Sequence, residues 1–302
     1  MGWFKYYNIQ LLPLDSGKTG MVGVDGYRKL LLGLRESLSK ARRRKNLESI
    51  AAPLRNDMFI VPFQVYVNGE SDAASGRFLK FNHIDALRDL FTGEETQKVG
   101  RGITNKRFEF EFVFDFRSHI MAIADKTSLP SSAPLCKALT LLFADQAKDL
   151  FAEHIVRVTE LTEGDSLDAV LLADGYKRVE VDVTFSNSDD YEDGMEKELE
   201  EELRGKNIHD ASYTEKSEKD SEMTQISRFA QAMLHLAIKY GNASVRYIKD
   251  KSTHWYHMKD FPVRLNLKIE SDESEMDYFG RIKNSIVVAA ARARRKLVKR
   301  KL

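Results

Sequence analysis

The stretch KRFEFEFVFDFRSH, Lys106–His119, carries a phenylalanine at every second position and acidic residues at three of the positions between them. Alternate side chains of a β-strand point to opposite faces of the sheet. The stretch therefore predicts a strand with one aromatic face and one carboxylate face. The aromatic positions are Phe108, Phe110, Phe112, Phe114 and Phe116, and the acidic positions are Glu109, Glu111 and Asp115.

The carboxylate face of this strand has two interpretations. Metal-dependent nucleases hold Asp and Glu side chains close together, usually with a Lys or His nearby. Here Arg107 and Arg117 share the face of the carboxylates, whereas Lys106 falls on the aromatic side. Charges of opposite sign at alternate positions are typical of cross-strand ion pairs, and antiparallel sheets commonly expose one face to water. We therefore interpret the face as a solvated scaffold and keep a metal site as the alternative.

Length and composition limit the class of protein. The 302-residue chain contains 42% hydrophobic and 31% charged residues, which is typical of a soluble globular protein. No apolar run approaches the roughly 18 residues of a membrane-spanning helix, and the first residues lack the pattern of a signal peptide. Cys136 is the single cysteine, so neither an internal disulfide nor a thiolate metal cluster can form. These features predict a protein of the reducing cytoplasm, without a membrane segment or a cofactor.

Hydrophobic periodicity predicts an α+β fold with mainly antiparallel sheets and packed helices, in two parts. Residues 186–225 hold few large apolar side chains, so we expect an acidic helix and a mobile linker there. The expected parts are an N-terminal sheet domain over 1–185, this segment, and a C-terminal α+β unit over 226–302. Strands are expected over residues 3–14, 57–67, 77–81, 106–119, 154–159, 178–185, 243–249 and 263–269, and helices over 25–45, 131–150, 226–240 and 275–302. Residues 118–124 are expected either to pair with the phenylalanine strand or to continue it beyond a bend.

Two strand features carry further expectations. Pro62 favours an edge or a bulge, because its nitrogen cannot donate to a ladder. The segment HWYH, His254–His257, lies between two expected strands and is interpreted as a hairpin loop. Two histidines without a third ligand do not make a zinc site. Trp255 and Tyr256 could instead stack on exposed bases.

Other candidate sites are weaker. Gly17, Lys18 and Thr19 lie between a strand and a helix, as in a phosphate-binding loop, but the position that needs a glycine is Leu12. No serine or cysteine nucleophile belongs to a recognisable local motif. We therefore predict no catalytic and no metal-binding residue.

The net charge of +1 hides a strong segregation of charge. Residues 189–203 hold nine acidic side chains against one lysine, whereas residues 281–302 hold nine basic side chains and no acidic one. The dipole of a helix accounts for only a charge or two in its last turn. Cations without acidic neighbours suit a polyanion. A purely structural tail, or an acidic partner that includes the chain's own acidic block, is the alternative.

We therefore predict that the C-terminal helix binds nucleic acid and that the cluster RRRK, Arg42–Lys45, extends its surface. The candidate nucleic-acid-binding residues are Arg42, Arg43, Arg44, Lys45, Arg292, Arg294, Arg295, Lys296, Lys299 and Arg300.

Three segments, taken in order, resemble a little-characterised bacterial family catalogued as a domain of unknown function. They are GRFLKFNHID (76–85), NKRFEFEFVFDFRSHIMAI (105–123) and YKRVEVDVTFSNSDD (176–190). In that family a strand of this Lys-Arg-Phe form precedes a His-bearing strand, and a strand ending in Asn-x-Asp-Asp precedes an acidic helix. The order of elements is also similar to that of the RexA phage-exclusion protein, which implies phage defence and DNA binding without sequence preference. Neither resemblance supplies catalytic residues.

The basic helix and the resemblances together predict a cytoplasmic bacterial anti-phage protein of the abortive-infection kind. It is expected to bind nucleic acid, DNA rather than RNA, without strong sequence preference, without catalysis of its own and with homo-oligomerisation left open. One alternative is a nuclease-type toxin in which Glu109, Glu111 and Asp115 meet in the fold. The other is a non-catalytic scaffold that binds proteins through the acidic helix.

Overall fold

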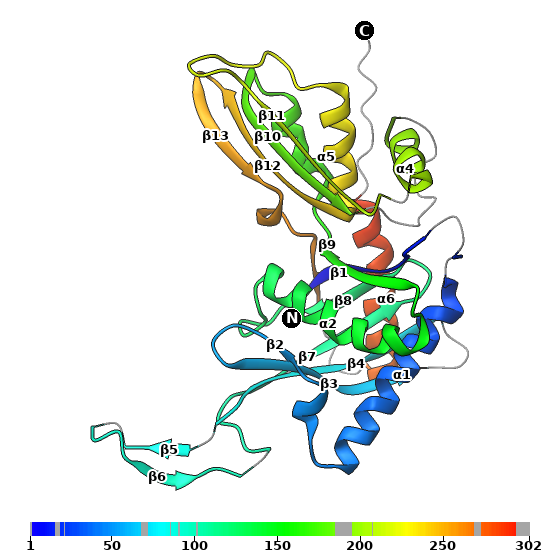
Figure 1. Cartoon of the computed structure of the whole chain (residues 1–302), viewed down its shortest axis with the longest axis vertical. Coiled ribbons are helices and arrows are strands. Elements are labelled where there is room, and N and C mark those ends of the chain that lie inside the picture. The colour runs from blue at the N-terminus through cyan, green and yellow to red at the C-terminus, as the bar shows by residue number, and fades with distance from the viewer. Residues whose placement is uncertain are drawn as a thin grey trace.

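The computed structural model describes residues 2–15, 19–20, 22–67, 72–84, 86–89, 91–100, 102–184, 195–206, 208–268 and 273–293. Its elements confirm an α+β fold built from antiparallel sheets and packed helices, arranged in two lobes (Figure 1). The lower lobe holds the larger sheet and the upper lobe holds a smaller one. Within the described ranges, no helix is both long and apolar enough to cross a membrane.

The larger sheet is 8-stranded, with the order β14-β1-β8-β7-β4-β3-β2 and with β9 paired to β1. The phenylalanine strand β7 lies between β4 and β8, and the antiparallel β7–β8 pair shows that the residues after it pair with it and do not continue it. The strands are β1 (Gly2–Pro13), β2 (Ala52–Pro53), β3 (Met58–Val67), β4 (Ala73–Asn82), β7 (Arg107–Asp115), β8 (Ile120–Ala124), β9 (His154–Glu160) and β14 (Arg264–Leu267).

Helices α1 (Gly23–Arg43) and α2 (Ser132–Leu150) cover the phenylalanine face of this sheet (Figure 1). Phe110, Phe112 and Phe114 are fully buried in one core with apolar residues of both helices. Phe108, at the start of the strand, is 36% exposed. The predicted aromatic face is therefore confirmed from Phe110 to Phe116.

Helix α6 (Glu275–Arg292) covers part of the opposite face, which carries the carboxylates. Val113 lies between Glu111 and Asp115 on that face, is 2% exposed, and shares a core with Ile282 and Ile286 of α6. The expectation of a solvated face was wrong for this part of the strand. The physical reason is that Val113 and its apolar neighbours on β8 offer the apolar stripe of α6 a surface to bury.

Pro62 lies at a bulge in β3, as predicted. The register between β3 and β4 shifts between Pro62 and Gln64. Gly76 of β4 faces the bulge, where an added Cβ would lie 1.9 Å from the Gln64 carbonyl oxygen. The position therefore requires glycine, because the bulge brings two backbones together.

The smaller sheet is 4-stranded, antiparallel, and has the order β11-β10-β12-β13. Helix α5 (Arg228–Tyr240) packs on one face, and the acidic helix α4 (Met195–Gly205) lies beside α5 (Figure 1). Strand β13 replaces the hairpin loop that we expected around His254 and His257. The strands are β10 (Gly175–Thr184), β11 (Asp210–Lys216), β12 (Gly241–Lys249) and β13 (Ser252–His257).

Strand β11 occupies residues where we expected a mobile linker. It pairs with β10 along its whole length, from Lys216 opposite Arg178 to Asp210 opposite Thr184. Few apolar side chains hold it. One of them is Tyr213, whose ring centroid lies 4.8 Å from that of Phe229 in α5. An edge strand gains much of its order from backbone hydrogen bonds, so a polar sequence can form it. The linker expectation was therefore wrong for this stretch, while residues 185–194 lie outside the described ranges.

Strand pairing also crosses the expected divisions of the chain at residues 185 and 226. In the smaller sheet β12 pairs with β10, and in the larger sheet β14 pairs with β1. The polar composition that suggested a division near residue 186 thus belongs, in the described residues, to α4 and β11 of the smaller lobe. Residues from both ends of the chain build the larger lobe.

Between β4 and β7 the chain leaves the larger sheet as an exposed arm, in which β5 (Ala86–Arg88) pairs with β6 (Glu95–Lys98) (Figure 1). Phe91 lies between these two strands and is 94% exposed. The remaining described elements are the short turns η1 (Leu47–Ile50), η2 (Gly164–Leu167) and η3 (Met258–Asp260) and the helix α3 (Asp168–Leu171).

His119 connects the turn after β7 to α1. Its φ is 58°, in the left-handed region, and its ring centroid lies 4.3 Å from that of Tyr27 in α1. Burial, reinforced by the charge of Lys239, lowers the pKa of His119 from 6.5 to about 4. The folded chain therefore holds this imidazole neutral at neutral pH.

We expect Phe112→Ala to lower the free energy of unfolding by about 3–5 kcal/mol, since it removes a fully buried ring. Phe108→Ala is the matched control and should cost about 1 kcal/mol or less, because Phe108 is 36% exposed. Urea unfolding followed by circular dichroism measures both values. Equal losses in the two variants would contradict the difference in burial along the strand.

A second prediction concerns pH. The stability that neutral His119 contributes is fully present above its unfolded pKa of 6.5 and is lost as the pH falls toward 4, because the unfolded chain binds the proton first. His119→Asn removes the titrating group and tolerates the positive φ. Between pH 6.5 and 4 the wild-type chain should lose up to about 3 kcal/mol more than the variant. Denaturant unfolding at several pH values measures this, and parallel pH profiles would contradict it.

Candidate nucleic-acid interface

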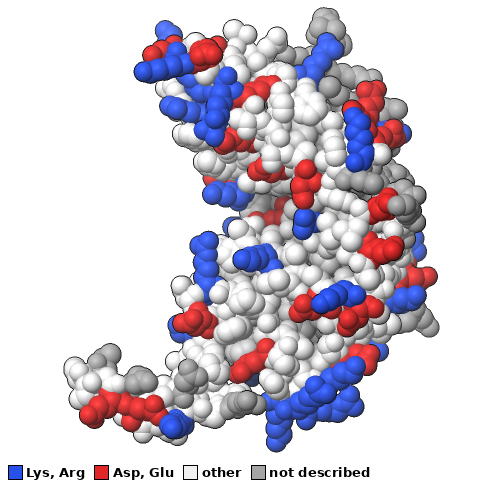
Figure 2. All heavy atoms as spheres, viewed as in Figure 1, with Lys and Arg blue, Asp and Glu red and all other residues white. Residues whose placement is uncertain are grey.

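The predicted cluster Arg42–Lys45 lies at the C-terminal end of α1. The apolar stripe of α1 packs on the sheet up to Ala41, and the four basic side chains that follow are exposed. In the described part of the chain, no carboxylate lies within ion-pair distance of them. Figure 2 shows Lys and Arg side chains gathered at this lower end of the molecule. The cluster is therefore a group of exposed cations that form no ion pair with the described carboxylates, although Lys40 and, to a smaller extent, Arg43 lower the pKa of the nearby Glu36 carboxyl.

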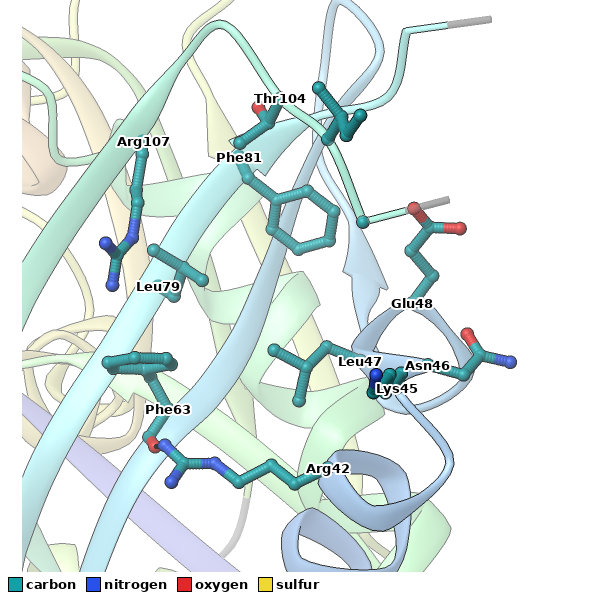
Figure 3. Close-up of a pocket in the computed structure, with 12 residues that line it drawn as sticks. Arg42, Lys45, Asn46, Leu47, Glu48, Phe63, Leu79, Phe81, Thr104 and Arg107 are labelled. Carbon is teal, nitrogen blue, oxygen red and sulfur yellow. Dashed lines mark hydrogen bonds between the residues drawn. The ribbon is translucent and has the colours of Figure 1, made fainter. Parts of the chain in front are cut away.

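A pocket of about 580 Å³ lies beside this cluster, over the face of β3, β4 and β7 that points away from α1 and α2 (Figure 3). Segments far apart in the sequence meet in it: the end of α1, η1, three strands and the root of the arm. The lining residues are Arg42, Lys45, Asn46, Leu47, Glu48, Phe63, Leu79, Phe81, Gly102, Ile103, Thr104 and Arg107.

The ring of Phe63 lies between two guanidinium groups at one end of the pocket. The guanidinium carbon of Arg42 is 4.9 Å from the ring centroid and that of Arg107 is 5.0 Å from it, and Figure 3 shows them on opposite sides of the ring. Arg42 also donates a hydrogen bond to the Phe63 carbonyl oxygen. Arg107 is held by Glu109, whose carboxylate is 2.6 Å away. Both cations are thus fixed beside an aromatic ring.

The floor of the pocket is apolar and its rim is positively charged. Leu79 and Phe81 form part of the floor, and each is 7% exposed. Arg42 and Lys45 stand at the rim, and the single carboxylate in the lining, Glu48, is 3.3 Å from His83. A planar apolar group that carries an anion matches both features, and a nucleotide is such a group. The volume also falls in the range of about 300–1,000 Å³ that is usual for small-molecule sites.

Sequence reasoning missed Phe63, Leu79, Phe81 and Arg107 as site residues. A signal was present, because β3 and β4 carry apolar residues at successive positions, as in MFIVPF and RFLKF. Such runs indicate strands that are covered on both faces. The second covering of these strands comes from η1 and the arm, whose positions the sequence pattern does not reveal.

Arg292 lies at the C-terminal end of α6, far from the end of α1 (Figure 1). Its Nη1 is 3.3 Å from the carboxylate of Glu163 and 3.4 Å from the carbonyl oxygen of Arg264. The structure therefore does not join Arg292 and the α1 cluster into one surface. The other predicted residues of the basic helix, Arg294, Arg295, Lys296, Lys299 and Arg300, lie outside the described ranges.

The carboxylates Glu109 and Glu111 of β7 form ion pairs. Glu109 is 2.6 Å from Arg107 of its own strand and 3.7 Å from Arg77 of β4. Glu111 is 2.8 Å from Lys126, which follows β8. These contacts agree with the interpretation of the face as a scaffold, although α6 covers part of it.

The third carboxylate, Asp115, stabilises the turn after β7. It accepts hydrogen bonds from the Ser118 backbone N–H at 2.9 Å and from the Ser118 hydroxyl at 2.7 Å. Among the residues that the structure describes, no three His, Cys, Asp or Glu side chains are grouped so that they could hold a metal ion. The observed contacts of all three acidic residues are structural.

Comparison with known proteins agrees with the family resemblance seen in the sequence. A family model described as a domain of unknown function (DUF4747) matches residues 24–284. This range contains the whole pocket and every strand except β1. No curated protein matches the chain.

We expect the double change Glu109→Gln and Glu111→Gln to alter the free energy of unfolding by about 1 kcal/mol or less, since partly exposed ion pairs contribute little. Nucleic-acid binding should persist in this variant, because the amide oxygen of a glutamine at position 109 can still accept the hydrogen bond of Arg107. Urea unfolding and a binding titration measure the two effects. If the variant folds normally but loses all activity in cells, the scaffold interpretation is wrong and these carboxylates belong to a functional site.

Proposed function

Because the chain belongs to the DUF4747 family, whose description states no activity, we propose its function from its own residues: it binds nucleic acid through the basic end of α1 and the pocket beside it. The observation that supports this most directly is the ring of Phe63 between the guanidinium groups of Arg42 and Arg107. The exposed cations Arg43, Arg44 and Lys45 continue from it along the surface.

The chemistry of this surface suits a phosphodiester chain with an unpaired base. Phosphates attract exposed cations and release bound counterions, which supplies most of the sequence-independent affinity. Arg42 and Lys45 are at the rim, where a phosphate would lie, and a base can cover the apolar floor around Phe63, Leu79 and Phe81. Stacking of a base on such a floor needs no particular base, so little sequence preference is expected.

The basic C-terminal segment is proposed as a second source of phosphate contacts. Six of its cations, Arg292, Arg294, Arg295, Lys296, Lys299 and Arg300, occur without an acidic residue among them in the sequence. This part of the proposal rests on charge pattern alone. It predicts that removal of residues 294–302 weakens binding and lowers its dependence on salt.

A bacterial phage-defence role is proposed only because the order of elements is similar to that of the RexA phage-exclusion protein. The preference for DNA over RNA rests on the same similarity. A nuclease-type toxin is less favoured, because Glu109 and Glu111 are engaged by Arg107, Arg77 and Lys126. A scaffold that binds proteins through α4 remains an alternative, since its exposed Glu side chains suit a basic partner. Cytoplasmic location and homo-oligomerisation stay predictions.

The test is a double variant, Arg42→Ala with Lys45→Ala. It should weaken binding of single-stranded and duplex DNA alike and reduce the slope of log K against log salt by about 1.4–1.8, the contribution of two phosphates. Fluorescence anisotropy with labelled DNA between 50 and 200 mM salt (concentrations chosen about a physiological value) measures both.

The matched control is Arg35→Ala with Lys40→Ala, which removes the same charge from exposed positions earlier on α1. This control should retain most of the affinity, because its residues do not line the pocket. Equal weakening in the two variants would mean that net charge, and not this site, governs binding. No binding of any nucleic acid by the wild-type chain would refute the proposed function.

A further inference from the structure

The smaller sheet has a second face, opposite α5. Val179, Val181 and Val245 are buried in the core that contains α5. Because side chains alternate along a strand, the residues next to these valines in each strand point to the other face. There Arg246 and Asp182 are exposed. This face belongs to the upper lobe, whereas the elements that line the pocket, among them β3, β4 and the end of α1, belong to the lower lobe (Figure 1).

Three basic residues and a tryptophan form one row across this face. Lys216 of β11 is opposite Arg178 of β10, Arg178 is opposite Arg246 of β12, and Arg246 is opposite Trp255 of β13. Residues that are directly opposite have Cβ atoms about 4.5–5.5 Å apart. The row therefore crosses the whole sheet at right angles to its strands.

The positive charge of this row is only partly compensated. Like charges in directly opposite positions destabilise a sheet. Arg178 pairs with Glu180, and this contact lowers the pKa of the Glu180 carboxyl. In the part of the chain that the structure describes, neither Lys216 nor Arg246 lies within ion-pair distance of a carboxylate. The Nε of Arg178 is covered and has no hydrogen-bond partner there. Such a row suits an anionic ligand that lies across it.

The aromatic end of the row is exposed and held in place. Trp255 is 54% exposed. Its ring centroid is 5.7 Å from the guanidinium carbon of Arg246 and 5.5 Å from the ring centroid of His257, with an angle of 8° between the two rings. A large, oriented and exposed aromatic ring is what a stacking platform needs. The ring could not be assigned to such a face from sequence, where it was expected in a loop.

Cations and an aromatic ring on one flat face select between polyanions. A duplex keeps the faces of its bases inside, so Trp255 could contact only its edges. A single strand offers both repeated phosphates and exposed base faces. The carboxylates of Glu180 and Asp182 lie beside the row on the same face, where they would repel phosphates. A chain of phosphates would therefore meet less repulsion along the row than along the strands.

We propose that the exposed face of β11, β10, β12 and β13 binds a short single-stranded segment of nucleic acid, with phosphates along Lys216, Arg178 and Arg246 and a base stacked on Trp255. The inference rests on the proposed function for the class of ligand, but it uses different residues at the other end of the molecule. DNA and RNA share the chemistry that this face recognises.

The first experiment uses the tryptophans of the full chain as reporters. The chain has 2 tryptophans, Trp3 and Trp255. Addition of a 12-nucleotide dT strand or rU strand (a length of about one single-strand site) should quench the fluorescence of the wild-type chain and of Trp3→Phe. Trp255→Phe should lose the quenching. Quenching that survives in Trp255→Phe and disappears in Trp3→Phe would overturn the inference.

The second experiment measures affinity by anisotropy of labelled dT and rU strands. Trp255→Ala should weaken binding of the strands by about 5- to 150-fold, the range expected for one stacked base, and should leave a matched duplex nearly unaffected. Arg246→Ala should lower the salt slope by about 0.7. Trp3→Ala and Lys249→Ala are the controls, since they remove an exposed aromatic and an exposed cation outside the row. Circular dichroism and thermal unfolding confirm that each variant is folded.

The two proposals fail in different ways. If the pocket variant Arg42→Ala with Lys45→Ala loses binding while Trp255→Ala binds like wild type without a change in quenching, the sheet inference is wrong and the pocket stands. If Trp255→Ala and Arg246→Ala lose single-strand binding while the pocket variant does not, the sheet face stands and the pocket assignment is wrong. If the wild-type chain binds neither strand nor duplex, both are wrong.

Discussion

The packing of α6 against β7 and β8 is the contact on which the arrangement of the molecule depends. The Tyr6 hydroxyl of β1 is 2.7 Å from the Ser285 hydroxyl of α6, and both residues are buried. Val113 and Ile286 belong to a core that continues without a break into α5 and the smaller sheet. Separation of the lobes would expose this core to water, which is unfavourable in proportion to the apolar area uncovered. The C-terminal helix therefore covers the larger sheet and belongs to the core that both lobes share.

This packing changes the meaning of the carboxylate face. Where α6 lies on the sheet, Val113 is buried. Arg107 and Glu109 lie nearer the start of the strand. There Glu109 holds Arg107, and Arg107 in turn lies over the ring of Phe63. An acidic residue that resembles a metal ligand in the sequence thus positions a basic residue in the fold. The same ion pair connects the scaffold of the sheet to the rim of the pocket.

The two surfaces proposed for nucleic acid use one arrangement twice. At the lower end Arg42 and Arg107 lie against Phe63, and at the upper end Arg246 lies against Trp255. A guanidinium near an aromatic ring keeps its charge and loses some of its freedom, so less entropy is lost when a phosphate binds. The net charge of +1 conceals both sites, because electrostatic attraction of a polyanion depends on local and not on average charge.

The sequence by itself determined the local features. The period of two in β7 fixed its two faces, and the apolar spacing of α1 and α6 fixed which side of each helix is buried, because these properties depend on neighbours within a few residues. The tertiary structure alone decided which element covers each face. It also placed β11 at a sheet edge and brought Arg42, Phe63 and Arg107 together in one pocket. Strand pairing and pocket formation join segments far apart in the chain, and a periodicity read along the sequence contains no information on which of them will meet.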